Sequence, residues 1–260
     1  MAIFGKRPIV FGTPYTFRWL SPLGTPSVLR WLSPLGIVLA LCLGAVRAEA
    51  FEIKGKISLA PPWPEAQAVA VQKDQTTCGV DQISEILLVS KQGFLQNTVV
   101  SLEGDFPKQT QTLASLPILN QQACRFDPHI LLVPQDQPFL IGNGDRISHD
   151  VRAFGGSQML FRFEMKFLER PVEKVFNQPG VHVIRCGLHP WMHAFVVSTE
   201  HPYYAVSDAQ GQFQMREVPA GEYTLKIWHE TLGEKKIPLA LTQSIEDFNY
   251  TFSSVNTEVG

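Results

Sequence analysis

Apolar and polar side chains alternate one by one along much of the chain after residue 50. Residues 159–167 carry apolar side chains at every odd position, and residues 181–184 and 222–227 follow a similar pattern. Alternation with a period of two is typical of strands that bury one face. Turn-forming residues separate these segments at 142–145, 178–180, 208–211 and 219–221. Many short strands at this spacing predict an all-β sandwich fold.

Helical patterning is scarce. Only residues 230–235 or 110–116 have a pattern that is compatible with a short turn of helix. No low-complexity linker divides the chain after residue 50. A second domain would therefore have to pack closely against the first, or be interleaved with it.

The first 50 residues differ from the rest of the chain. Four basic residues lie between Lys6 and Arg30, an apolar run follows at 37–46, and the run ends in Ala48-Glu49-Ala50. A basic start, a short apolar stretch and an A-x-A end are typical of a signal peptide, which we predict for residues 1–50 with cleavage near Ala50. About ten apolar residues are too few for a stable transmembrane helix. We therefore expect a periplasmic or secreted protein without stable membrane insertion; an uncleaved anchor is the alternative.

Removal of residues 1–50 takes away five basic residues and one acidic residue, and it changes the net charge from −2 to −6. Binding to nucleic acid depends on Lys and Arg that neutralise phosphates. An acidic chain without a basic cluster therefore argues against a nucleic-acid partner.

The cysteine count carries a second prediction. Cys42 would leave with the signal peptide, so that Cys78, Cys124 and Cys186 remain. An odd number in an oxidising compartment implies one pair and one cysteine with another role. We predict a disulfide between Cys78 and Cys124 and reserve Cys186 for that role. The alternative, three free buried thiols, would be unusual outside the cytoplasm.

Cys186, His189 and Met192 follow the spacing C-x2-H-x2-M at the end of a predicted strand. A thiolate, an imidazole and a thioether in one tight loop favour copper, and a blue-copper site needs one further imidazole. We assign that position to His149, which directly follows a polar turn. Pro190 would stiffen the loop between two of the ligands.

Two other interpretations of this loop are weaker. Structural zinc sites use several Cys or His residues in paired spacings, and a Met ligand does not suit zinc. Each of the three residues alone is more often a buried core residue than a ligand. Three of them within seven residues make that interpretation improbable.

A family resemblance supports the same site. Residues 126–134 (FDPHILLVP), the segment from Asn143 to Asp150, and residues 176–181 ahead of Cys186 resemble the corresponding segments of cupredoxins such as plastocyanin and amicyanin. The resemblance implies a Greek-key β-sandwich over residues 121–200. It also implies one type 1 copper ion, with the ligand set His149, Cys186, His189 and Met192.

The chain departs from the family at two positions near this site. Asp150 stands where cupredoxins often have an Asn that ties the two ligand loops together, and Gly187 stands where a hydroxyl residue is common. The usual side-chain tie is therefore expected to be absent. Our hypothesis is that the Asp150 carboxylate favours Cu(II) and lowers the reduction potential.

The flanking segments show a second resemblance. Residues 201–213 and 218–225 resemble the hairpin of the carboxypeptidase regulatory-like (transthyretin-like) β-domain. The resemblance implies a discontinuous domain over residues 51–120 and 201–255 into which the cupredoxin domain is inserted; a single enlarged cupredoxin is the alternative. The chain after residue 50 also resembles periplasmic plastocyanin-like proteins named methylamine utilization proteins.

These resemblances imply a one-electron carrier rather than an enzyme, because four protein ligands leave no open position on the metal. In the family an edge of the loop histidine reaches the surface. Redox partner proteins would then dock transiently near His189, framed by Pro190 and Trp191. Alternatives are a copper-binding or delivery protein, and an interaction module in which copper is structural.

Overall fold

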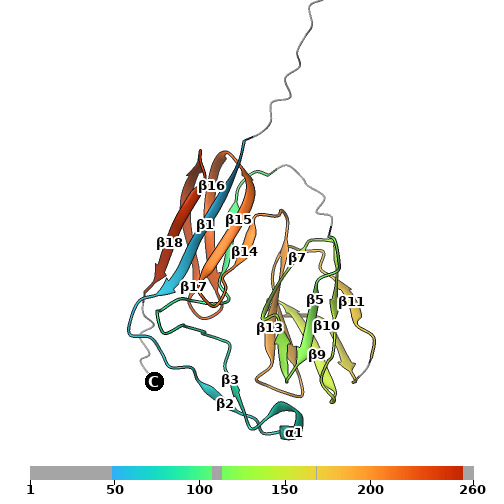
Figure 1. The fold of residues 1–260 in the computed structure, drawn as a ribbon. Helices are drawn as coiled ribbons and strands as arrows, with labels where there is room; N and C mark the ends of the chain where they lie inside the picture. The colour runs from blue at the N-terminus through green and yellow to red at the C-terminus, as the bar shows by residue number, and fades with distance from the viewer. Residues whose placement is uncertain (1–48, 107–112, 168, 254–260) are drawn as a thin grey trace, which may run out of the picture. The chain divides into compact units, whose positions relative to one another are not determined.

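The structure is a computed structural model that describes residues 49–106, 113–167 and 169–253. Almost all regular structure in these ranges is β, so the predicted all-β class is confirmed (Figure 1). The predicted signal peptide and Cys42 lie outside the described residues, apart from Glu49 and Ala50. Within those ranges no helix has both the length and the apolar composition that a membrane span requires.

The first sandwich consists of a three-stranded sheet, ordered β15-β1-β18, and a four-stranded sheet, ordered β14-β4-β16-β17. Its strands come from both ends of the described chain, as the blue and red ribbons of Figure 1 show. They are β1 (Ala50–Leu59), β4 (Val99–Glu103), β14 (Tyr204–Val206), β15 (Gln212–Pro219), β16 (Gly221–His229), β17 (Gly233–Leu241) and β18 (Ile245–Phe252).

The second sandwich uses the chain between these two parts. One sheet has the order β10-β9-β12-β13-β7, and the facing sheet has the order β11-β8-β5-β6. The strands are β5 (Ile118–Gln122), β6 (Arg125–Asp127), β7 (Ile130–Pro134), β8 (Pro138–Ile141), β9 (His149–Gly155), β10 (Gln158–Met165), β11 (Val172–Val175), β12 (Gly180–Cys186) and β13 (His193–Thr199).

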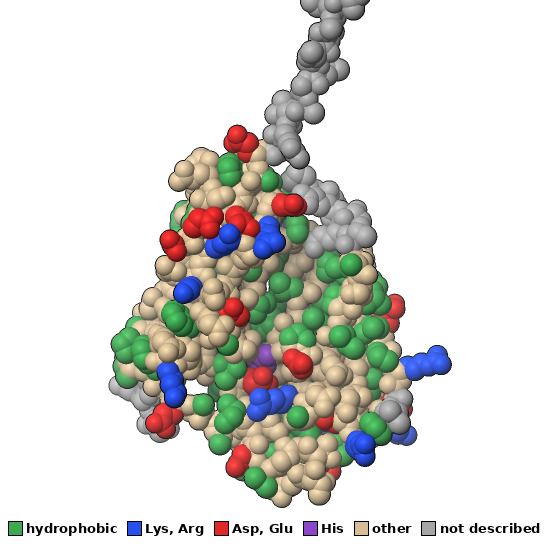
Figure 2. Space-filling model, viewed as in Figure 1, with side chains coloured by type: hydrophobic (Ala, Val, Ile, Leu, Met, Phe, Trp, Pro, Cys, Tyr) green, Lys and Arg blue, Asp and Glu red, His purple; other side chains and the backbone are tan. Residues whose placement is uncertain are grey.

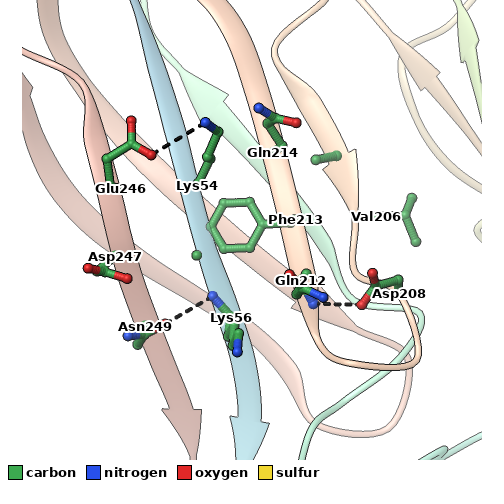
Figure 3. Close-up of a pocket in the computed structure, with 12 residues that line it drawn as sticks. Lys54, Lys56, Val206, Asp208, Gln212, Phe213, Gln214, Glu246, Asp247 and Asn249 are labelled. Atoms are coloured by element: carbon green, nitrogen blue, oxygen red, sulfur yellow. Dashed lines mark hydrogen bonds and ion pairs between the residues drawn. The ribbon is translucent and has the colours of Figure 1, made fainter.

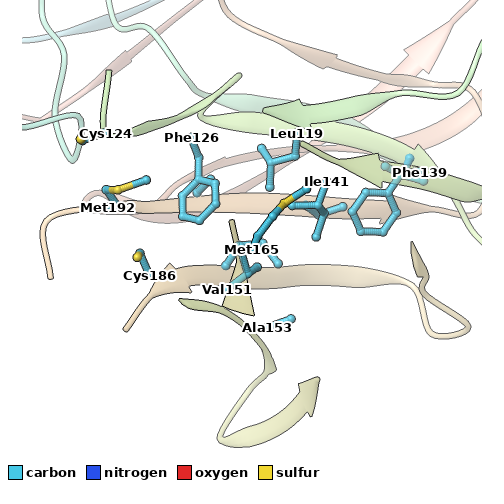
Figure 4. Packing of buried hydrophobic residues seen from close by; sticks show 14 of the residues in the cluster. Leu119, Cys124, Phe126, Phe139, Ile141, Val151, Ala153, Met165, Cys186 and Met192 are labelled. Carbon is cyan, nitrogen blue, oxygen red and sulfur yellow. The ribbon is translucent and has the colours of Figure 1, made fainter. Parts of the chain in front are cut away.

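Alternation along the strands builds each core. In β16 the side chains of Tyr223, Leu225 and Ile227 are buried while the intervening residues are partly exposed, as a period of two requires. In the second sandwich, Leu119, Phe126, Phe139 and Ile141 of one sheet pack into the same core as Val151 of the other (Figure 4). Burial of these apolar surfaces is the main favourable contribution to folding.

Cys186 and Met192 belong to that same core cluster. They lie toward one end of the row of buried side chains in Figure 4, away from Phe139 at the other end. The C-terminal end of β12 and the loop that follows it therefore bring two of the candidate ligands to the end of a packed hydrophobic core.

The predicted disulfide is confirmed: Cys78 and Cys124 are bonded, with their Cα atoms 5.1 Å apart. Cys78 ends the short helix α1 (Gln75–Cys78), and Cys124 lies in the turn between β5 and β6. In this segment α1 lies between the strands β2 (Ala68–Ala70) and β3 (Asp81–Ile83), which pair with each other. The disulfide thus fastens this segment to the second sandwich.

The helical expectation for residues 230–235 was wrong. Residues from Gly233 onward belong to β17, which pairs with β16 from Gly221↔Leu241 to His229↔Gly233. Pairing with an amphipathic neighbour outweighs a weak local preference for helix. Of the segment 110–116, residues 110–112 lie outside the described residues, and no helix is found at 113–116.

Replacing both half-cystines, as Cys78→Ser with Cys124→Ser, should lower the free energy of unfolding. The disulfide closes a 46-residue separation, which on the chain-entropy model corresponds to about 4 kcal/mol. Urea unfolding of the double variant, compared with the oxidised protein, measures the difference. An unchanged unfolding midpoint would contradict the prediction.

Candidate metal centre

Three of the predicted ligands come together in the structure. His149, Cys186 and His189 each offer one ligand atom, these atoms all lie within 4.8 Å of one another, and all three residues are buried. His149 begins β9 and Cys186 ends β12, two antiparallel neighbours in which Cys186 pairs with Val151. His189 lies in the loop that connects β12 to β13.

The separations fit a single metal ion. His149 Nδ1 and His189 Nδ1 are 3.1 Å apart, and they lie 3.7 and 3.5 Å from Cys186 Sγ. Metal–nitrogen bonds of about 2.0 Å and a metal–sulfur bond of about 2.3 Å, at angles of about 120°, separate sulfur from nitrogen by about 3.7 Å and nitrogen from nitrogen by about 3.5 Å. The observed triangle differs from these values by less than half an ångström.

Met192 is buried beside this triangle. Its side chain belongs to the same apolar cluster as Cys186, and only 2% of the residue is exposed. The backbone also joins the two residues, because Cys186 N–H donates to the Met192 carbonyl at 3.1 Å. Met192 N–H in turn donates to the His189 carbonyl at 2.9 Å. These two backbone hydrogen bonds hold the residues from Cys186 to Met192 in one tight loop.

The surroundings of Cys186 favour the ionised form of its thiol. Burial alone would raise its pKa, but the polar contacts of its sulfur with the imidazoles of His149 and His189 outweigh burial and lower the pKa from 9.0 to about 6. The thiolate is the form that binds metals. A soft anionic donor next to two imidazoles is suited to copper.

Both imidazoles are held from outside by carboxylates. His149 Nε2 lies 3.0 Å from Asp145 Oδ2, and His189 Nε2 lies 2.9 Å from Asp74 Oδ2. If each Nε2–H donates to its carboxylate, each Nδ1 lone pair faces the sulfur of Cys186. Such an outer carboxylate sets the tautomer and orientation of a metal-binding imidazole. The hydrogen-bond partners thus favour the tautomers that bind metal.

Asp145 is itself fixed by the fold. Its carboxylate accepts a hydrogen bond from Cys124 N–H at 2.9 Å. Burial would raise the pKa of Asp145, but this bond and the one from His149 lower it overall. In return, the Asp145 hydrogen bond raises the pKa of His149 despite burial, which acts in the opposite direction.

The expectation that an edge of His189 reaches the surface is wrong. His189 is 0% exposed, because Asp74 lies over its outer nitrogen. Asp74 immediately precedes α1, the helix that the disulfide fastens to the second sandwich. On the face that Figure 2 shows, histidine side chains contribute only a small patch.

The two ligand-bearing segments are tied by backbone rather than by a side chain. Gly187 N–H donates to the Asp150 carbonyl at 2.7 Å. The carboxylate of Asp150 instead forms ion pairs with Arg152 and Arg162, the latter at 2.8 Å. A Cβ on Gly187 would meet the side-chain ends of Arg152 and Asp150, so a larger residue at this position would require these side chains to shift.

These ion pairs change the hypothesis about the reduction potential. Burial would raise the pKa of Asp150, but hydrogen bonds from Arg162 and Arg152 lower it, so the group is an anion flanked by two cations. The hypothesis that Asp150 favours Cu(II) considered the charge of its carboxylate only and stays a prediction. The two guanidinium charges would offset the effect of this carboxylate on the metal.

The remaining predicted residues of the site have identifiable contacts. Asn143 Nδ2 donates to the carbonyls of Ile147 and Met165, and this shapes the turn that precedes His149. Trp191 Nε1 donates to the Cys124 carbonyl at 3.1 Å, which joins the ligand loop to the disulfide. Pro190 lies exposed between His189 and Trp191.

The prediction from sequence missed Asp74 and Asp145 as partners of the histidines. Asp74 is 115 residues from His189 in the chain, so no local pattern could pair them. Asp145 lies in the polar turn ahead of His149, at a spacing of four residues. The carboxylate of Asp145 in that turn was the sequence feature from which its contact with His149 could have been predicted.

A groove in the first sandwich differs in composition from the candidate metal centre. This groove of about 730 Å³ lies over β1, β15 and β18 of the first sandwich, lined by Lys54, Phe213 and Glu246 among others (Figure 3). Lys54 Nζ lies 3.3 Å from Glu246 Oε2 in it. Its lining residues include neither histidine nor cysteine. Among the described residues the free cysteine is Cys186, so a thiolate donor is present in the second sandwich and not in this groove.

Comparisons with known proteins yield structural neighbours. No family model matches the chain, and no curated protein matches it. Among solved structures, a purple cupredoxin from Nitrosopumilus maritimus is 22% identical, with 32% of this chain and 96% of that chain covered and a TM-score of 0.28. A reduced amicyanin variant is 20% identical, with coverages of 34% and 87% and a TM-score of 0.30.

A copper-containing nitrite reductase from Thermus scotoductus is 21% identical; 35% of this chain and 24% of that chain are covered, with a TM-score of 0.30. Similarity at this level assigns neither a family nor an activity to the chain. The resemblances to transthyretin-like domains and to methylamine utilization proteins stay predictions.

Asp74→Asn should weaken copper binding by about 10-fold to 100-fold, which is the usual effect of losing an outer-shell partner. The amide keeps the shape of the carboxylate but removes the charge that orients His189. Competition with a chelator of known affinity measures the change. Asp81→Asn, an exposed carboxylate of the same segment, is the matched control, and equal affinities in both variants would contradict the prediction.

Proposed function

We propose that the chain is a type 1 copper protein that carries one electron at a time. One observation carries the proposal: two imidazole nitrogens and one cysteine sulfur form a buried triangle with the separations of a trigonal metal site. The sulfur of Met192, in the same buried cluster, would be the weak axial ligand. Copper held by these four residues would supply a Cu(II)/Cu(I) couple.

The protein's contribution to electron transfer would be rigidity. Asp145 and Asp74 hold the two imidazoles from outside, and the bond from Gly187 N–H to the Asp150 carbonyl holds the loop that follows Cys186 against β9. A site whose ligands are fixed changes its geometry little when the metal changes its charge. Burial of the ligands also keeps water away from the metal.

The same ligand set argues against catalysis at this site. Catalytic metal sites keep at least one position open for water or substrate. Three equatorial donors and one axial donor, all buried, would leave none. We therefore propose a carrier rather than an enzyme.

Electrons would leave near His189, but through the Asp74 segment rather than directly. The side chain of His189 is 0% exposed, whereas that of Asp74 is 31% exposed and contacts its outer nitrogen. A redox partner protein would dock transiently over this carboxylate. A partner with a basic surface at the contact would be the complementary one.

One equivalent of Cu(II), added to the metal-free protein, should produce an intense visible thiolate-to-copper band and an EPR spectrum with narrow parallel hyperfine splitting. Both features require direct bonding of copper to the Cys186 sulfur. In Cys186→Ser the band should be absent. A pale complex with wide hyperfine splitting, or an unchanged spectrum in Cys186→Ser, would rule out the type 1 centre.

Met192→Leu should raise the reduction potential by tens of millivolts, because loss of the axial thioether removes a donor that stabilises Cu(II). Spectro-electrochemical titration measures the shift. Met159→Leu is the matched control, since Met159 is 48% exposed on β10. If both variants keep the potential of the parent protein, Met192 is not a ligand.

A further inference from the structure

A second group of metal-ligating side chains lies outside the candidate copper centre. His129, His193 and Glu230 each offer one ligand atom, and these atoms all lie within 4.8 Å of one another. His129 immediately precedes β7, and His193 begins the adjacent parallel strand β13. Glu230 follows the last residue of β16. The group therefore links strands of both sandwiches.

The two imidazoles direct the same ring atom at one carboxylate. His129 Nε2 lies 2.5 Å from Glu230 Oε1, and His193 Nε2 lies 2.9 Å from Glu230 Oε2. The rings meet edge to face, with centroids 5.0 Å apart. Only 2% of the His129 side chain, 12% of that of Glu230 and 21% of that of His193 are exposed. Water thus competes little for these atoms.

The other nitrogen of each ring faces an oxygen on the opposite side. His193 Nδ1 lies 3.4 Å from the Trp191 carbonyl oxygen. His129 Nδ1 is buried without a hydrogen-bond partner among the described residues, and the nearest carboxylate oxygen given for it, Glu85 Oε2, is 3.8 Å away. A proton on Nδ1 of each ring would point toward these oxygens, as it commonly does in metal-binding histidines.

This tautomer leaves the two Nε2 lone pairs facing the oxygens of Glu230. Lone pairs that converge on a carboxylate repel it, unless a cation lies between them. A tetrahedral ion with bonds of about 2.0–2.1 Å would hold its donor atoms about 3.4 Å apart. The pairs at 2.5 and 2.9 Å would need to open by less than one ångström.

We propose that His129, His193 and Glu230 bind a divalent first-row transition-metal ion of the Zn²⁺ class. Two neutral imidazoles and one carboxylate suit such ions, and no soft donor is needed. Three protein ligands leave a position for water. A cavity of about 210 Å³, lined by His193, Trp191 and Glu85 among others, borders the proposed site on the side of His193.

This site shares no ligand with the candidate copper centre. It contains no thiolate, and it includes Glu230 of the first sandwich. The two sites are joined through the peptide bond between Met192 and His193. The inference therefore does not rest on the proposed electron-carrier function and can fail or hold independently of it.

The test uses the full chain with its copper site first loaded with one equivalent of Cu(II). Calorimetric titration with Zn²⁺ should then show one further equivalent, bound with a micromolar or lower dissociation constant. Glu230→Gln keeps the side-chain shape and the hydrogen-bonding capacity toward both rings. It should weaken this second equivalent by more than about 100-fold, since even an outer-shell loss costs up to about that much.

Two comparisons make the result decisive. Glu234→Gln, on the neighbouring strand β17 and exposed, should bind the second equivalent as the parent protein does. Cys186→Ser should also keep the second site, with Co²⁺ bound there free of thiolate charge-transfer bands. Absence of a further equivalent, its persistence in Glu230→Gln, or its loss in Cys186→Ser would overturn the proposal.

Discussion

The candidate copper centre depends on the hydrogen bond between Gly187 N–H and the Asp150 carbonyl, at 2.7 Å. It connects the residue after Cys186 to the residue after His149, so that the ends of two strands carry their side chains to one point. A Cβ on Gly187 would meet the side-chain ends of Arg152 and Asp150, which would then have to shift. The hydrogen bond therefore joins the two ligand-bearing segments through their backbones, without the side chain of Asp150.

A second constraint acts from outside the sandwich. The Cys78–Cys124 disulfide fastens the segment that carries Asp74, and the carbonyl of Cys124 accepts the Trp191 indole N–H. Cys124 N–H also donates to Asp145. A single half-cystine is thereby connected to the outer partners of both imidazoles. Stability of the fold and orientation of the ligands are coupled at this residue.

The segment that the disulfide fastens also covers the outer side of His189. Asp74 closes over His189 and leaves it fully buried, whereas the resemblance implied an accessible edge. The partly exposed carboxylate of Asp74 thus lies between the outer nitrogen of His189 and the solvent. Nearby, Glu230 reaches from the first sandwich to two imidazoles of the second. Polar contacts, in addition to the apolar cluster around Val99, Ile130, Phe195 and Val197, therefore connect the strands of both sandwiches.

The sequence by itself determined the all-β class and the spacing of three candidate ligands, because both depend on local patterns. Alternation predicts strands, and C-x2-H-x2-M places three donors in one loop. The odd cysteine count indicated one pair and one further cysteine, and the predicted pairing of Cys78 with Cys124 is confirmed. Only the tertiary structure decided which carboxylates contact the imidazoles and that His189 is buried. It also decided that Asp150 forms ion pairs with Arg152 and Arg162. These contacts join residues up to 115 positions apart, and their geometry follows from sheet pairing and a cross-link that no local pattern encodes.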